Sequence, residues 1–160
     1  MSTVRAKVEL RALGMGDLPA IDMIERASYP TPWSRSMFAG ELSKPSSICL
    51  GAFEAEGEDG ELCGYLIVSR YVDAWHVMNI AVAPLHRRRG IAWTLLDHLF
   101  RVTAGHGHRG YTLEVRVSNG DAIRLYESVG FKARGIRRGY YTDNREDAVI
   151  MWKDPVPASD

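Results

Sequence analysis

The stretch from Asn79 to Trp93, NIAVAPLHRRRGIAW, carries the clearest fold signal of this chain. It begins with an apolar run typical of a buried strand. It ends by opening a segment that continues to Thr103 with apolar residues at helical spacing. Three consecutive arginines and Gly90 lie between these two parts. The stretch therefore predicts a strand, an arginine-rich loop and a helix in succession.

The junction between this loop and the helix suits an anion such as a pyrophosphate. The first N–H groups of a helix lack partners within the helix, and the helix dipole attracts negative charge. A glycine at position 90 lets a ligand approach the backbone closely. The alternative is a solvated helix start in which Gly90 only forms a tight turn. A Walker-type GxxxxGK[ST] loop is absent from the chain, which disfavours a nucleoside triphosphate.

Strands and helices are predicted on both sides of this stretch. Alternating or continuous apolar runs predict strands at Val8–Arg11, Ser47–Glu54, Leu62–Tyr71, Trp75–Val82, Tyr111–Val117, Phe131–Arg137 and Asp147–Lys153. Helical spacing and capping residues predict helices after Asp17, after Ser34, over Arg88–Thr103 and after Asn119. This order predicts an α/β fold, a mixed α+β sheet of about seven strands with about four helices on both faces.

The bulk composition favours one compact domain. The chain has 160 residues, of which 46% are hydrophobic and 25% charged. We expect a single domain over residues 1–153 and a disordered tail over residues 154–160. Lysine plus arginine and aspartate plus glutamate both number 20, so net charge predicts no attraction to DNA or to an anionic membrane.

The cysteines and the apolar runs predict a cytoplasmic protein. Cys49 and Cys63 lie in apolar, strand-like segments without paired metal-ligand spacing, so we expect free thiols and no metal. A single disulfide is the alternative. No signal peptide and no apolar run long enough to span a bilayer is found in the sequence.

Three further motifs, taken with the loop, resemble those of a known protein family. Arg87, Gly90 and Ala92 match the pattern [QR]xxGx[GA] of the GNAT N-acetyltransferases. The segments NIAV, LEVRVSN and LYESVGF occur in order at 79–82, 113–119 and 125–131, which is similar to the arrangement in that family. The segment RRGYYTDNREDAVIM and the Pro32-Trp33 pair resemble most the subgroup that acetylates the N-terminal alanine of bacterial ribosomal proteins.

This resemblance implies a fold, a cosubstrate and its contacts. The fold would be a mostly antiparallel sheet, splayed at a central parallel pair of strands. The cosubstrate would be acetyl-CoA, bound without a metal. Its pantetheine arm would pair with Ile80, Ala81 and Val82, and Asn119 would also contact it. The residues around its pyrophosphate would be Arg88, Arg89, Gly90, Ile91, Ala92 and Trp93.

Direct transfer to an amine requires a proton acceptor, a proton donor for the departing thiolate and a donor for the oxyanion. Many relatives carry a glutamate base on the strand that reads HVMNIAV here, but this chain has Asn79 and no carboxylate between Trp75 and Val82. The resemblance implies Glu114 as the proton acceptor and Tyr126 as the donor. The alternatives are a solvent-facing Glu114 paired with Arg116 or a neighbouring strand, and a core tyrosine.

The acceptor side is implied by two aromatic loops. In related enzymes the loops that here contain Trp33 and the Tyr140-Tyr141 pair flank a peptide, although Trp33 could equally be a hydrophobic staple at a helix start. We therefore expect a protein or peptide N-terminus, from a ribosomal protein, as acceptor, and a monomer or weak dimer. The alternatives are a lysine or small-molecule acetyltransferase, an acyl-CoA sensor, and an RNA-binding module using HRRRG and RRGYY.

Overall fold

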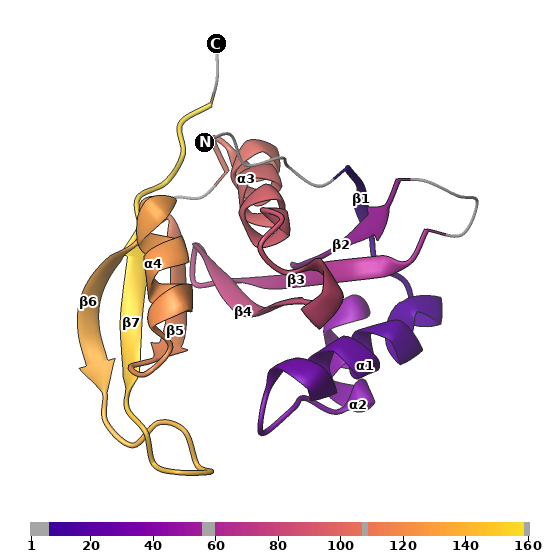
Figure 1. Ribbon diagram of the computed structural model, residues 1–160. Helices are drawn as coiled ribbons and strands as arrows, with labels where there is room; N and C mark the ends of the chain where they lie inside the picture. The colour runs from indigo at the N-terminus through magenta and orange to yellow at the C-terminus, as the bar shows by residue number, and fades with distance from the viewer. Residues whose placement is uncertain (1–6, 56–59, 107–108, 159–160) are drawn as a thin grey trace. The chain divides into compact units, whose positions relative to one another are not determined.

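The structure is a computed structural model that describes residues 7–55, 60–106 and 109–158 (Figure 1). Two short 3-10 turns, η1 (Met15–Asp17) and η2 (Pro84–His86), accompany the main elements. The helices and strands, in chain order, are β1 (Val8–Ala12), α1 (Leu18–Ser28), α2 (Arg35–Leu42), β2 (Ser47–Glu54), β3 (Leu62–Tyr71), β4 (Ala74–Val82), α3 (Ile91–Thr103), β5 (Tyr111–Arg116), α4 (Gly120–Ser128), β6 (Lys132–Arg137) and β7 (Ala148–Lys153).

These strands form one 7-stranded sheet in the order β1-β2-β3-β4-β5-β7-β6. The pairs β1–β2, β2–β3, β5–β7 and β6–β7 are antiparallel. The pair β4–β5 is parallel, with Trp75 opposite Tyr111 and His76 opposite Thr112. The predicted mixed, mostly antiparallel sheet with a parallel pair is confirmed.

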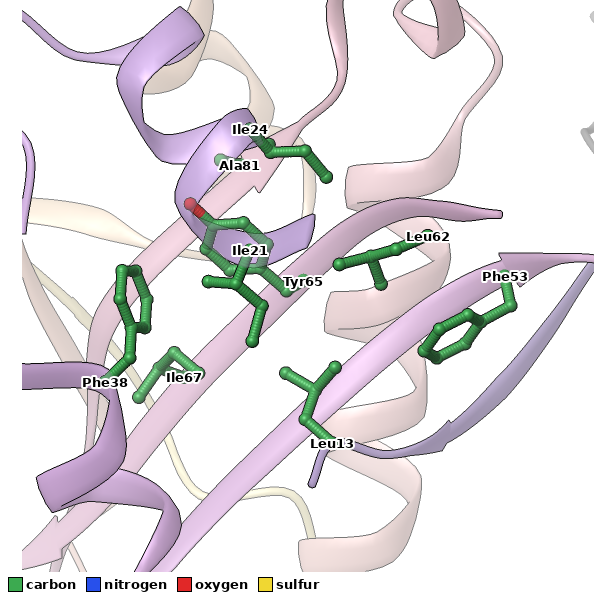
Figure 2. Packing of buried hydrophobic residues seen from close by; sticks show 9 residues of the cluster. All are labelled: Leu13, Ile21, Ile24, Phe38, Phe53, Leu62, Tyr65, Ile67 and Ala81. Atoms are coloured by element: carbon green, nitrogen blue, oxygen red, sulfur yellow. The ribbon is translucent and has the colours of Figure 1, made fainter. Parts of the chain in front are cut away.

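The chain divides into two compact units, which are described separately. The first comprises the described residues of Met1–Ser69 and Met78–His98. Its core lies between α1, α2 and the strands β2 and β3, and Figure 2 shows how the buried side chains meet. The members of this core are Leu13, Ile21, Ile24, Phe38, Phe53, Leu62, Tyr65, Ile67 and Ala81.

Gly64 on β3 permits a close approach on the sheet face opposite Tyr65. A β-carbon at Gly64 would lie 2.9 Å from the Ala81 carbonyl oxygen and 3.2 Å from Ile91 Cγ2. Successive residues of a strand face opposite sides of the sheet. Tyr65 therefore packs toward α1 and α2, while Gly64 makes room for the first residue of α3 and for β4.

The second unit comprises the described residues of Arg70–Val77 and Leu99–Asp160. Its core combines aliphatic side chains such as Leu99 and Leu113 with aromatic rings. The ring centres of Phe100 and Tyr111 lie 4.9 Å apart, and those of Tyr126 and Phe131 lie 5.8 Å apart. Along β5, buried residues alternate with partly exposed ones, as predicted. The domain limits at residues 153 and 154 stay predictions. The Val156 carbonyl, beyond that limit, accepts a hydrogen bond of 2.8 Å from the Gly105 N–H.

One predicted helix start and one predicted helix cap are wrong. Helix α3 begins at Ile91 rather than Arg88, because Arg88 and Gly90 have φ angles of 63° and 75°, which a right-handed helix does not allow. The Asp17 side chain does not cap α1. Its carboxylate instead accepts the Gly14 N–H at 2.8 Å and pairs with Arg11 at 3.1 Å.

The other two caps are confirmed. Ser34 Oγ accepts the Met37 N–H and Asn119 Oδ1 accepts the Ala122 N–H, both at 3.2 Å. Val117, predicted as the last residue of a strand, is exposed and lies just beyond β5, and Tyr126 is the single buried residue of α4. The predicted turn at Glu56–Glu61 and the predicted helix-ending Gly107 fall partly or wholly outside the described residues.

In the described part of the chain, no helix is long and apolar enough to cross a membrane.

Candidate active site

The start of α3 has the geometry of an anion site. The Thr94 N–H donates to the Gly90 carbonyl at 2.9 Å, which is the first hydrogen bond of the helix. The N–H groups of Ile91 and Ala92 precede it and have no acceptor within the helix. The Ile91 side chain is buried in the core, so a ligand could reach this residue through its backbone alone. No described side chain closes the space in front of Gly90, where an added β-carbon would meet nothing within 4 Å.

The three arginines before Gly90 have different surroundings. Arg87 donates to the Val82 carbonyl at 3.1 Å and to Ser28 Oγ at 3.2 Å, so it ties the loop to β4 and α1. Arg89 lies 2.7 Å from His86 Nδ1 and 3.6 Å from Glu54 Oε1. Arg88 is exposed. Because Arg87 and Arg89 have protein partners, HRRRG is a weaker candidate for RNA binding than its composition indicates.

Glu54, Cys63 and His86 form a compact polar cluster beside Arg89. Their potential ligand atoms all lie within 4.8 Å of one another. Burial raises the pKa of the Cys63 thiol to about 11, and the Glu54 carboxylate adds to this shift. The Arg89 guanidinium already supplies the positive charge between Glu54 and His86. A metal ion at this cluster would have to displace Arg89. Cys49 and Cys63 are both free, as predicted.

The edge of β4 that is predicted to bind the pantetheine arm is partly engaged within the protein. The Tyr29 hydroxyl donates to the Ile80 carbonyl, and Arg87 donates to the Val82 carbonyl. The Ala81 carbonyl faces Gly64 on β3. A ligand chain that adds to this edge would therefore use the N–H groups of Ile80 and Val82 or displace these two side chains. The sequence did not indicate the role of Tyr29.

A buried carboxylate, Glu25, organises the region around Asn79. Glu25 is 1% exposed and accepts hydrogen bonds from the Tyr65 hydroxyl, from Asn79 Nδ2 at 3.0 Å and from the Trp33 N–H at 2.9 Å. This residue was not predicted, because the strand that contains Asn79 has no carboxylate of its own. The available signal was position: Glu25 lies four residues after Ile21, on the apolar face of α1.

Trp33 has the geometry of a hydrophobic staple. Its ring lies 5.1 Å from the ring of Phe38, and Ser34 between them is the helix cap. The ring also packs against the core of the first unit. Its role in binding an acceptor stays a prediction.

In the second unit, Glu114 is held by two basic side chains. Its Oε2 lies 2.7 Å from His76 Nε2, and its Oε1 lies 3.5 Å from Arg137 Nε. The hydrogen bond from His76 lowers the pKa of this carboxyl, burial opposes that shift, and the charges of His76 and Arg137 add to the lowering. Of the two alternatives for Glu114, pairing with Arg116 is wrong, since Arg116 contacts Asp143 and Glu146. Pairing with a neighbouring strand is confirmed, because His76 lies on β4 beside β5. His76 was not predicted from the sequence as part of this site.

The predicted proton donor and cofactor contact lie on α4. Tyr126 is 7% exposed, and its ring packs edge-on against Phe131. Asn119 is exposed at the helix start, where its Oδ1 accepts the Ala122 N–H. This leaves the two N–H bonds of its amide for a ligand acceptor.

Arg116 fixes the loop that contains Tyr140 and Tyr141. Its guanidinium lies 2.9 Å from Asp143 Oδ2, 3.3 Å from Glu146 Oε1 and 4.0 Å from the centre of the Tyr141 ring. The two tyrosine rings are perpendicular, with centres 5.1 Å apart. Burial raises the pKa of Tyr141 to about 12, and burial followed by the charge of Glu114 raises the pKa of Tyr140.

Comparisons with known proteins define the class of the chain. The acetyltransferase (GNAT) family matches residues 18–131, more than half of the chain. This chain therefore belongs to the GNAT family and is an acetyltransferase.

Individual relatives and solved structures are similar to this chain over most of its length. The chain is 40% identical over 144 residues to the ribosomal protein bS18-alanine N-acetyltransferase of Escherichia coli K12, covering 89% of this chain and 94% of the relative. The crystal structure of the ribosomal-protein-S18-alanine N-acetyltransferase from Escherichia coli superimposes with a TM-score of 0.84 at 35% identity, covering 96% and 97% of the two chains. Arabidopsis thaliana NAA60, solved with acetyl-CoA, shares the fold with a TM-score of 0.80 at 22% identity, covering 91% and 97%.

Proposed function

We propose that the protein transfers the acetyl group of acetyl-CoA to the N-terminal amine of a protein, namely the N-terminal alanine of a small-subunit ribosomal protein. The observation that carries this proposal is the combination of the open α3 start with the Arg116-anchored loop of Tyr140 and Tyr141. The relative that is 40% identical acts on such an alanine, according to its name.

The first unit supplies the cofactor side of this proposal. Acetyl-CoA carries anionic phosphates, which suit the helix start at Ile91 and Ala92 and the exposed Arg88. The Gly90 backbone admits the pyrophosphate closely, and the N–H groups of Ile80 and Val82 face the pantetheine amides. Arg89 contributes through its backbone, since Glu54 and His86 engage its side chain.

The second unit supplies the chemistry and the acceptor side. Glu114 is part of the proton-accepting group, and Tyr126 protonates the departing thiolate of CoA. Tyr140, which is 45% exposed, and Tyr141 contact the acceptor backbone. An α-amine has a pKa of about 8, against about 10.4 for a lysine side chain, so an N-terminus is the easier amine to deprotonate near neutral pH.

The experiment is a turnover assay with an acceptor panel. Release of CoA is followed with a peptide beginning with alanine, the same peptide with an acetylated N-terminus and an internal lysine, and spermidine as a small polyamine. We expect the free N-terminal alanine to have the highest kcat/KM. A preference for the blocked peptide with lysine, or for spermidine, would contradict the proposed acceptor while leaving acetyl transfer in place.

A further inference from the structure

The contact between His76 and Glu114 constrains the position of a proton. The 2.7 Å between His76 Nε2 and Glu114 Oε2 is a hydrogen-bond distance between two groups that both accept when unprotonated. Two lone pairs cannot face each other at this separation without a proton between them. In a neutral His76, the proton therefore lies on Nε2 and the lone pair lies on Nδ1.

The carboxylate of this pair is a weak proton acceptor by itself. One oxygen faces His76 and the other faces Arg137 at 3.5 Å. The hydrogen bond from His76 and the positive charge of Arg137 hold the pKa of Glu114 below its ordinary 4.5. Against an ammonium with a pKa of about 8, such a carboxylate would hold the proton in fewer than about one in 1000 molecules. The basic site that remains in the pair is His76 Nδ1, which no described residue hydrogen-bonds.

We infer that His76 is a catalytic residue and that its Nδ1 receives the proton of the acceptor amine, directly or through one water, while Glu114 orients the imidazole. This inference rests on the proposed amine acetylation and identifies the side chain that accepts the proton in that reaction. The amine nitrogen forms a bond to the thioester carbon, the bond from that carbon to sulfur breaks, and the thiolate takes a proton from Tyr126. The amine proton moves to Nδ1.

The surroundings of the pair suit this role. Among the described residues, the charged and titratable groups that act on Glu114 besides His76 are Arg137 from β6 and the tyrosines Tyr140 and Tyr141 from the following loop. The Glu114 carboxylate stabilises the imidazolium that forms, in the way that a buried carboxylate supports a histidine base. The His76 side chain is 26% exposed, against 12% for Glu114, so the imidazolium can return its proton to water.

The test compares His76→Gln with Glu114→Gln and with a control, His106→Gln, at an exposed histidine of the same unit. The measured quantity is kcat/KM for an alanine-terminated peptide from pH 5.5 to 9, together with the Kd for acetyl-CoA. We expect His76→Gln to lower kcat/KM by about 100-fold or more and to change the acidic limb of the pH profile, with the Kd unchanged. Glu114→Gln keeps an oxygen that accepts the Nε2 proton and should lose less.

A structural role for His76 predicts a different pattern. A glutamine can still donate a hydrogen bond to Glu114. If the role of His76 were only structural, the His76→Gln enzyme would therefore keep the pH profile and nearly the full kcat of the unmodified protein. That result would overturn the inference while leaving the proposed function intact. Absence of turnover by the unmodified protein on every amine of the panel would reject the proposed function and the inference together.

A second measurement is independent of turnover. Nitrogen-15 NMR of the histidine-labelled protein reports which ring nitrogen carries the proton in the neutral form, and the His76→Gln spectrum assigns the signal. We expect the proton of His76 on Nε2 and an unprotonated Nδ1. A neutral His76 with its proton on Nδ1 would overturn the inference even if the protein acetylates the peptide.

Discussion

The side-chain amide of Asn79 on β4 donates a hydrogen bond of 3.0 Å to the carboxylate of Glu25 on α1. Through the same carboxylate, the Trp33 N–H and the Tyr65 hydroxyl are also satisfied. Strand β4 has no carboxylate of its own, but Glu25 places one beside it. The oxygens of Glu25 accept hydrogen bonds from three buried or half-buried donors. This arrangement joins α1, the loop before α2, β3 and β4 within the first unit.

Replacing Glu25 should destabilise the protein. In Glu25→Ala, the donors on Trp33, Tyr65 and Asn79 lose their acceptor, and each unsatisfied buried group costs about 1–3 kcal/mol. We expect the free energy of unfolding in urea to fall by about 3 kcal/mol or more, and by less in Glu25→Gln. The control is Glu9→Ala at an exposed position of β1. A loss from Glu25→Ala as small as that from Glu9→Ala would contradict this account.

Replacing Gly90 should weaken the binding of acetyl-CoA. Gly90→Ala puts a β-carbon on a residue with φ of 75°, at a strain of about 1 kcal/mol, and into the space where the pyrophosphate is proposed to lie. We expect the Kd for acetyl-CoA, measured by calorimetry, to rise about tenfold or more, which is at least about 1.4 kcal/mol. Gly40→Ala, within the exposed face of α2, is the control and should leave the Kd unchanged. Equal affinities of the two variants would exclude Gly90 from the phosphate site.

Removing the hydroxyl of Tyr126 should slow the chemical step. Tyr126→Phe keeps the ring packing against Phe131 but removes the proposed proton donor to the thiolate. We expect kcat to fall by about 100-fold or more in single-turnover measurements, with little change in the Kd for acetyl-CoA. Tyr71→Phe at an exposed tyrosine is the control. A Tyr126→Phe enzyme with full single-turnover rate would show that the thiolate obtains its proton elsewhere.

Removing Arg116 should affect the acceptor more than the cofactor. Arg116 holds Asp143, Glu146 and the Tyr141 ring, so its loss frees the loop that is proposed to contact the peptide. We expect Arg116→Ala to raise the KM for the peptide by about tenfold, which corresponds to about 1.4 kcal/mol, with a smaller change in the KM for acetyl-CoA. The control is Arg134→Ala on the exposed side of β6. Equal increases in both KM values would argue against a role specific to the acceptor.

Glu146 should make the stability of the protein depend on acid. Hydrogen bonding from Ser118, followed by Arg116 and Asn144, lowers the pKa of Glu146 to about 2. A carboxyl with a lowered pKa contributes stability that is present above its unfolded pKa of 4.5 and is lost as the pH falls toward about 2. Urea unfolding at several pH values should show Glu146→Gln to be less stable than the unmodified protein near pH 6. The difference should shrink between about pH 4.5 and 2. Glu127→Gln, at an exposed glutamate of α4, is the control. A difference that does not depend on pH would contradict the prediction.

Local patterns predicted the elements well where the signal itself is local. The observed limits of β2 and β3, Ser47–Glu54 and Leu62–Tyr71, are those predicted, because apolar runs bounded by turn residues mark both strands. The caps at Ser34 and Asn119 were also predictable, since a cap needs only its own next three residues. The predicted cap at Asp17 does not form, because its carboxylate bonds to Gly14 and Arg11 instead. When a polar side chain has two sets of hydrogen-bond partners within reach, its place in the sequence does not show which set it bonds.

The strand, loop and helix around Gly90 and the motifs of the GNAT family were predictable from the sequence, because these depend on short-range order along the chain. It also placed Glu114 on the polar face of β5 by simple alternation. Two contacts became visible in the folded chain alone: Glu114 hydrogen-bonds with His76, 38 positions away, and Glu25 with Asn79, 54 positions away. Such pairs depend on which strands and helices become neighbours and in what register. The same packing assigned Arg87 and Arg89 to protein partners and left Arg88 exposed.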